Sequence, residues 1–75
     1  MRVVTEPTLL PDLLDFLSRT VCVAVQISRD ALQVTIPVAL DDEQARRELL
    51  LYLAVWRAMR PGAQVALVSP KGPEG

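Results

Sequence analysis

Two neighbouring segments in the middle of the chain, 21–28 and 32–38, alternate between branched aliphatic residues and smaller or polar ones. The aliphatic positions are Val21, Val23, Val25 and Ile27 in the first segment and Leu32, Val34, Ile36 and Val38 in the second. A period of two residues is that of a β-strand with one side against a core. The pattern therefore predicts two strands whose aliphatic rows face the protein interior.

The short connection between these strands predicts a hairpin. Closing it through residues 28–31 places Val25 opposite Val34 and brings both aliphatic rows to one face. The other face is then uncharged and consists of Cys22, Ala24, Gln26, Gln33, Thr35 and Pro37. Because a wet antiparallel face normally carries polar or charged residues, we expect another protein layer to cover it. The alternative is an ordinary exposed face that lacks Lys and Glu.

Apolar residues recur at helical spacing in two further segments. The first runs over residues 8–19, with Pro11 in its first turn, where the missing N–H costs little. The second runs from Asp41 to about Arg60, with Asp41 and Gln44 as a possible capping box. A Pro-Gly pair follows this second helix and predicts its end.

Segments 2–5 and 63–68 complete the predicted order as (β)αββαβ. This order predicts a small α+β, ferredoxin-like sandwich, with two helices on one face of an antiparallel sheet. If residues 2–5 are not a strand, a three-stranded sheet under two helices remains. We expect a single domain over residues 1–68, followed by a disordered tail at 69–75, which has no aliphatic or aromatic residue to bury.

The second helix is more apolar than docking on a sheet requires. One stripe of the helical wheel suffices for docking and contains Ala45, Leu49, Tyr52, Trp56 and Met59. Further apolar residues lie at the sides and back of the wheel, namely Leu50, Leu51, Ala54, Val55 and Ala58. A helix that is apolar nearly all round is buried nearly all round. We therefore expect a second chain or a larger partner to cover these positions.

Composition narrows the function classes. The chain has 75 residues, eight basic and nine acidic, with a net charge of −1, which is not the electrostatic footprint of a nucleic-acid binder. No apolar run reaches the roughly 18 residues that span a membrane. Cys22 is the one cysteine and there is no His, which excludes an internal disulfide and argues against a zinc site. The lone thiol and the lack of a secretory signal predict a cytoplasmic protein, and the excess of Arg over Lys is associated with GC-rich bacterial genomes.

No cluster of residues predicts catalysis. Cys22 has no His to activate it, and packing in a strand explains it better. The acids Asp41, Asp42 and Glu43 suit the positive end of a helix without a bound cation. The chain has no glycine-rich phosphate loop, and its strands lack the stacking aromatics of an RNA-binding sheet. We therefore predict no enzymatic activity, no cofactor or metal, and no nucleic-acid or membrane partner.

The element order and the stretch from Val3 to Val25 resemble the amino-acid-binding regulatory ACT domains in topology. In that family the turn after the first strand usually carries a glycine that lets a ligand approach the backbone. The corresponding turn here is Glu6-Pro7-Thr8-Leu9-Leu10, with no glycine, so the resemblance transfers no site residue.

The sequence thus predicts a non-catalytic interaction or assembly module, acting as a homo-oligomer or as a subunit or domain of a larger complex. Its partner is a second copy or another protein, through the uncharged sheet face and the excess apolar face of the second helix. The alternative is a small-molecule-sensing regulatory domain of the ACT type, with its ligand at a subunit interface. The sequence contains no motif for such a ligand.

Overall fold

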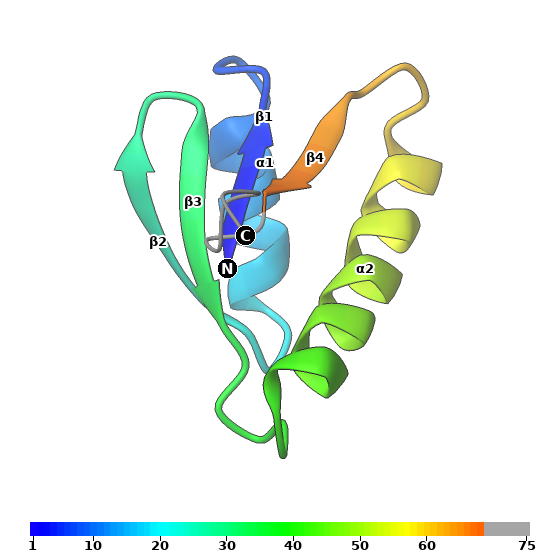
Figure 1. Ribbon diagram of the computed structural model, residues 1–75. Helices are drawn as coiled ribbons and strands as arrows, with labels where there is room; N and C mark the ends of the chain where they lie inside the picture. Colours follow the sequence, from blue (N-terminus) through cyan, green and yellow to red (C-terminus); the bar gives the residue numbers. More distant parts are fainter. Residues whose placement is uncertain (69–75) are drawn as a thin grey trace.

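Strands and helices follow one another in the predicted order, and residues 2–5 do form a strand (Figure 1). The computed structural model describes residues 1–68, so the tail predicted at 69–75 lies outside the described residues. The elements are β1 (Arg2–Thr5), α1 (Leu10–Ser18), β2 (Val23–Ser28), β3 (Ala31–Thr35), α2 (Asp42–Met59) and β4 (Val65–Val68).

The four strands form one sheet in the order β2-β3-β1-β4, and every neighbouring pair is antiparallel. Both helices pack on the same face, because side chains from α1, α2, β1 and β3 meet in one core around Leu13, Trp56, Val3 and Leu32. Helix α1 lies against β2 and β3, and α2 lies on the β4 side (Figure 1). The protein is therefore a small α+β fold with one helix-covered sheet face and one open face.

The two helices begin differently. Asp41 caps α2, since its Oδ1 accepts a hydrogen bond from the backbone N of Gln44 at 2.8 Å. The Gln44 side chain reaches back in return and accepts from the backbone N of Leu40 at 3.1 Å, one residue before the position of a standard capping box. Helix α1 has no side-chain cap, and it begins at Leu10, two residues later than the predicted range of 8–19, with Leu9 at its N-cap.

The predicted pairing of the β2–β3 hairpin is wrong by one residue. At the turn, Ser28 does pair with Ala31, but the register shifts between Gln26 and Ser28, so that Ile27 is an extra residue, as in a β-bulge. Beyond it, Ala24 rather than Val25 lies opposite Val34. Because side chains alternate between faces, a shift of one residue turns the whole strand over.

The consequence is that the aliphatic row of β2 lies outside the core. Val23, Val25 and Ile27 of β2 and Val21 before it are all exposed, whereas Cys22 is buried and Ala24 packs against the core. The second aliphatic row is placed as predicted for Leu32 and Val34 of β3 and for Ile36, which are buried, but not for Val38, which lies beyond the end of the strand and is 66 % exposed. Small residues thus lie beneath α1, which rests against β2, and the valines face the open side of the sheet.

Helix α2 packs on the sheet through a stripe that differs slightly from the predicted one. Its buried residues are Ala45, Leu49, Leu53 and Trp56. Tyr52 is half-buried at the border of the stripe, and Met59, which was predicted to lie within it, is half-exposed in the last turn. The buried side of α2 therefore includes Leu53 in place of Met59, and Leu53 lies four residues after Leu49 on the same side of the helix.

Candidate functional site

Apolar side chains gather on the open face of the sheet. The pairing places on it Arg2 and Val4 of β1, Val23 and Val25 of β2, Ala31, Gln33 and Thr35 of β3, and Ala66 and Val68 of β4. Ile27, at the register shift, is also exposed. Among the strand residues described on this face, Arg2 is the one charge. We call this set the sheet-face patch.

The exposure of the patch is unusual for a surface in contact with water. Val25 has 56 % of its surface exposed, and Val23 and Ile27 are close to one half. Single exposed apolar residues are common, but contiguous apolar patches mark interaction sites. Strand β2 is also an edge strand without a charged residue, although edge strands normally carry charges that block unwanted pairing. The patch and the neighbouring edge therefore have the character of an interface.

The predicted interface residues on the hairpin are divided by the structure. Gln33 and Thr35 lie on the open face and are exposed, as predicted. Cys22, Ala24 and Gln26 do not belong there, because the register shift turns them to the helix-covered side. Cys22 is part of the core, Ala24 is half-buried against it, and Gln26 lies at the exposed sheet edge, where its Nε2 donates to the carbonyl of Ser28.

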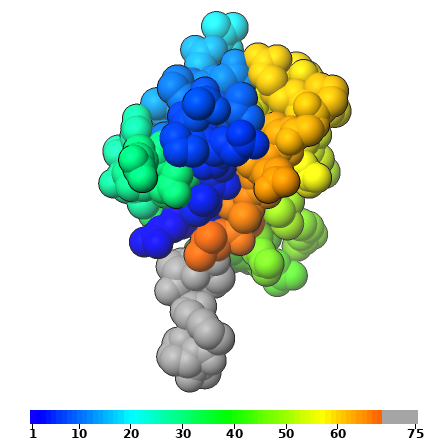
Figure 2. Space-filling view, turned by 90° about the horizontal axis from the view of Figure 1, so that it is seen from above, coloured from blue at the N-terminus to red at the C-terminus, as the bar shows by residue number. Residues whose placement is uncertain are grey.

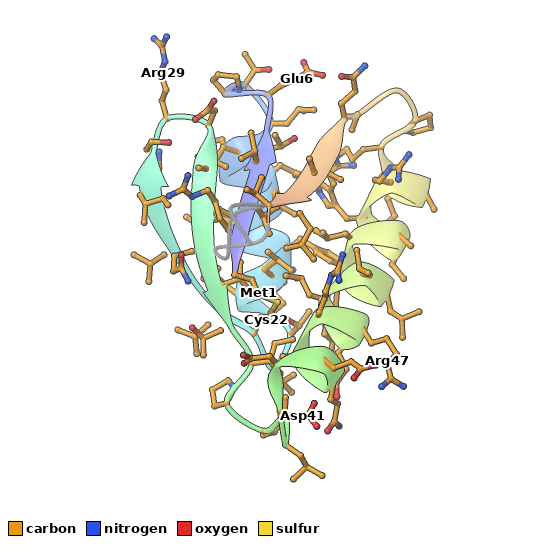
Figure 3. The ribbon with its side chains drawn as sticks, in the orientation of Figure 1. Met1, Glu6, Cys22, Arg29, Asp41 and Arg47 are labelled. Atoms are coloured by element: carbon orange, nitrogen blue, oxygen red, sulfur yellow. The ribbon has the colours of Figure 1, made fainter. Side chains whose placement is uncertain are left out.

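A second apolar surface lies on the outer side of α2. The predicted residues Leu50, Leu51, Ala54, Val55 and Ala58 are all exposed, as is Met59. Leu51 has 68 % of its surface exposed. Figure 3 shows Arg47, one turn earlier than Leu51, pointing away from the sheet. We call these six apolar residues the α2 patch.

The ends of α2 carry opposite charges. Its first turn is acidic, with Asp42 and Glu43 following the capping Asp41, and its last turn contains Arg57. All four side chains are exposed. Arg46 and Arg47 separate the acidic turn from the α2 patch, and Arg47 lies 3.8 Å from the carboxylate of Glu43. The acids of the first turn and Arg57 in the last turn each have the sign that stabilises that helix terminus.

The strongest polar cluster holds the two helices together. The guanidinium of Arg60 contacts the carboxylate of Asp12 through two hydrogen bonds, of 2.9 Å from Nε and 2.7 Å from Nη2. The indole Nε1 of Trp56 donates to Oδ2 of the same carboxylate at 2.8 Å. These hydrogen bonds, first that from Arg60 and then that from Trp56, lower the pKa of Asp12. Every charge of the cluster is paired within it, so a structural link between α1 and the end of α2 accounts for these residues.

The single thiol has the environment of a packed side chain. Burial raises the pKa of Cys22, and the negative charge of Glu48 raises it further. A thiol with a raised pKa holds little nucleophilic thiolate near neutral pH. Within residues 1–68, no group of three or more His, Cys, Asp or Glu residues is placed to hold a metal ion. No helix in this part of the chain is long and apolar enough to cross a membrane.

Comparison of the chain with known protein families, curated proteins and solved structures gave no match. The function is therefore inferred from the two apolar surfaces themselves. Sequence reasoning found the α2 patch from the helical wheel but placed the wrong side of β2 in the sheet-face patch. It also missed Leu40, 89 % exposed in the loop before α2, which belongs to no periodic element.

Proposed function

We propose that this protein is a non-catalytic protein–protein interaction module with a ferredoxin-like fold, and that it self-associates through the sheet-face patch. The observation that carries the proposal is the row Val23, Val25 and Ile27, which is apolar, half-exposed and on an edge strand without charge. The strand order and the antiparallel pairing of neighbours agree with a split βαβ arrangement. In that arrangement the helix-free face is available to a partner.

The energy available from the patch supports a reversible contact. Covering a half-exposed Val or Ile side chain contributes about 1 kcal/mol, half of the value for complete burial. In a symmetric dimer each residue is counted twice, so the three β2 residues contribute about 6 kcal/mol. Association costs about 4–15 kcal/mol in lost translational and rotational freedom. Burial of other apolar residues of the patch, Val4, Ala66 and Val68, is therefore needed to offset the cost of association. We expect the dimer to dissociate on dilution.

A second copy is the partner that suits this surface best. The patch is neutral except for Arg2, and a copy of the chain presents the same neutral, apolar face. Two such faces exclude water without burying many unpaired charges, whereas an ordinary charged surface would have to be desolvated. Residues Gln33 and Thr35, beside Arg2 on the patch, provide oxygen acceptors for the guanidinium across a two-fold axis.

The proposal is tested by placing a carboxylate on the patch. Val25→Glu adds a charge at an exposed position, so the monomer fold is retained, while a dimer would have to bury it. Gln26→Glu is the matched control, because it changes the next residue of the same strand on the other side of the sheet. Mass would be measured by light scattering over roughly a hundredfold range of concentration, with circular dichroism to verify folding.

We expect the wild type and Gln26→Glu to exceed the chain mass of 8.3 kDa, and Val25→Glu to lose the sheet-face contact. A wild type that remains at 8.3 kDa at the highest concentration would exclude self-association. A dimer that Val25→Glu leaves intact would place the contact elsewhere. The small-molecule-sensing alternative predicts instead that an amino acid or another metabolite raises the melting temperature, which an assembly module does not require.

A further inference from the structure

We infer that the outer edge of β2 pairs with the β2 edge of a second copy, antiparallel across a two-fold axis, so that two four-stranded sheets join into one. Strand β2 ends the sheet, and no element of the described chain lies beyond it (Figure 1). Every β2 residue except Ala24 is exposed. Figure 2 shows the β2–β3 hairpin and the last turns of α2 on opposite sides of the molecule, so this part of α2 lies away from an approaching copy.

The hydrogen bonds of β3 indicate which backbone groups of β2 are available. The backbone N–H of Val34 in β3 donates to the carbonyl of Met1, just before β1, at 2.6 Å. The backbone N–H of Thr5 in β1 donates to the carbonyl of Asp30, just before β3, at 3.0 Å. Both even-numbered positions therefore direct these groups toward β1. Because this direction alternates along a strand, the odd-numbered residues of β3 direct their backbone groups toward β2.

The strand pairing then leaves four backbone groups at the outer edge of β2. Val23 and Val25 lie opposite odd-numbered residues of β3, so the N–H and C=O groups of these valines point toward β3. The N–H and C=O groups of Ala24 and Gln26 point the other way. In the described part of the chain these groups have no strand beside them, and an exposed strand edge of this kind is a template for another extended backbone.

A second copy supplies the matching groups in one register. With the two-fold axis at Val25, Ala24 of one copy lies opposite Gln26 of the other, and these two residues exchange two hydrogen bonds. The axis repeats the same pair on its other side. All four outward groups of each chain therefore gain a partner, and the partner needs no sequence other than that of β2 itself.

Existing hydrogen bonds disfavour the neighbouring symmetric registers. An axis at Ala24 would place Gln26 opposite Cys22, whose N–H already donates to Oγ1 of Thr20 at 3.1 Å. An axis at Gln26 would place Ala24 opposite Ser28, whose carbonyl already accepts from Nε2 of Gln26 at 3.0 Å. The axis at Val25 therefore satisfies the edge without breaking a bond of the single chain.

The side chains of β2 agree with this pairing. The strand has no charged residue, so no like charges meet across the axis. Val25 lies opposite Val25 of the other copy at a position without hydrogen bonds, where facing side chains are closest. The axis is perpendicular to the sheet, so the helices of both copies stay on one side and the two sheet-face patches become continuous on the other. The edge contact is separate from the proposed sheet-face contact and does not depend on it.

Amide hydrogen exchange measured by NMR tests the direction of the groups and the pairing together. The N–H groups of Val23 and Val25 should be protected at every concentration, because they bond to β3. Those of Ala24 and Gln26 should exchange rapidly in dilute protein and become protected as the concentration rises. Protection of Ala24 and Gln26 in the dilute monomer would overturn the assigned directions. Rapid exchange of both at the highest concentration would exclude the edge contact.

Two variants separate the edge contact from the sheet-face contact. Gln26→Pro removes an outward N–H and places a proline ring at the edge, a position where a strand tolerates proline because the N–H bonds to no neighbour. Gln26→Ala is the matched control, which keeps the N–H, and circular dichroism verifies folding. Ala66→Glu places a carboxylate on the open face of β4, at the far end of the sheet from β2. Val25→Glu does not separate the contacts, because Val25 belongs to both.

Light scattering at high concentration then gives distinct outcomes. We expect wild type and Gln26→Ala to exceed a dimer, Gln26→Pro and Ala66→Glu each to stop at twice the chain mass of 8.3 kDa, and the double variant to remain at 8.3 kDa. If Gln26→Pro keeps the wild-type mass, the edge contact is wrong. If Gln26→Pro lowers the mass and Ala66→Glu does not, the edge contact stands and the sheet-face proposal is wrong. Growth of Ala66→Glu beyond a dimer would indicate that β2 pairs with β4 of the next copy in an open chain, and would overturn the two-fold arrangement.

Discussion

Removing the side chain of Trp56 tests how the core is held together. Trp56 is the largest fully buried side chain, with 0 % of its surface exposed. It lies in the core with Leu49 and Leu53 of the same helix, and its indole N–H donates to Asp12 of α1. The Trp56→Ala substitution therefore removes both apolar burial and a hydrogen bond between the two helices.

The expected loss is about 3–5 kcal/mol of unfolding free energy, the usual cost of truncating a large buried aromatic residue to alanine. Domains are stable by about 5–15 kcal/mol, and one of this size belongs near the lower end. Trp56→Ala should therefore be partly or largely unfolded near room temperature. The partner carboxylate of Asp12 is half-exposed and retains Arg60, so the lost indole bond leaves no buried group unpaired.

Chemical denaturation followed by far-ultraviolet circular dichroism measures this loss, since the variant has no tryptophan for fluorescence. All proteins are compared at one concentration, because self-association also adds stability. The control is Leu51→Ala, on the exposed side of the same helix, which should change stability of the monomer by less than about 0.5 kcal/mol. A Trp56→Ala variant with an unchanged midpoint would show that the indole is not part of the core.

Three further outcomes follow from individual contacts. Because hydrogen bonds from Arg60 lower the pKa of Asp12, the carboxylate stabilises the fold above its unfolded pKa of about 3.9, and this stabilisation disappears as pH falls through the lower folded pKa. Asp12→Asn should therefore have a lower melting temperature than wild type near neutral pH, and the difference should vanish in acid. A difference in melting temperature that does not change with pH would show that the charged carboxylate of Asp12 does not stabilise the fold. Cys22 should react slowly with a thiol reagent in the folded protein and rapidly in denaturant, so equal rates would show that it is accessible. Ala24→Glu should lower the denaturation midpoint of the monomer itself, which a residue on the open face would not do.

The sequence predicted the order of elements but misplaced one strand. The alternation of small and aliphatic residues in β2 has the correct period, and the turn pairing of Ser28 with Ala31 is also correct. A single extra residue at Ile27 reverses which side faces the helices. Alternation alone gives a strand two equivalent orientations, and the choice between them depends on contacts with α1 that are distant in the sequence.

The candidate surfaces were predictable to different degrees for the same reason. A helical wheel depends only on local geometry, so it placed the exposed side of α2 correctly, at Leu50, Leu51, Ala54, Val55 and Ala58. The link between Asp12 and Arg60 joins residues 48 positions apart, and nothing in the local pattern of either segment indicates it. Register across strands and pairing across helices are set by tertiary packing, which periodicity does not describe.

The apolar row of β2 connects the sequence with the proposed function. Val23, Val25 and Ile27 have the composition and the period of a strand side that faces an interior, and in the single chain they face solvent. Such a row would be costly to keep exposed, because a neutral, β-branched edge strand promotes uncontrolled pairing between chains. If the sheet-face patch is covered by a second copy, the row does face an interior, that of the assembly. An interface of this kind requires the same residues as a core, which is why alternation alone assigned them to the core of one chain. The Val25→Glu and Gln26→Glu pair distinguishes these two interiors, because Gln26→Glu should still assemble and lose that added stability on dilution, whereas Val25→Glu should be a folded monomer whose stability does not depend on concentration.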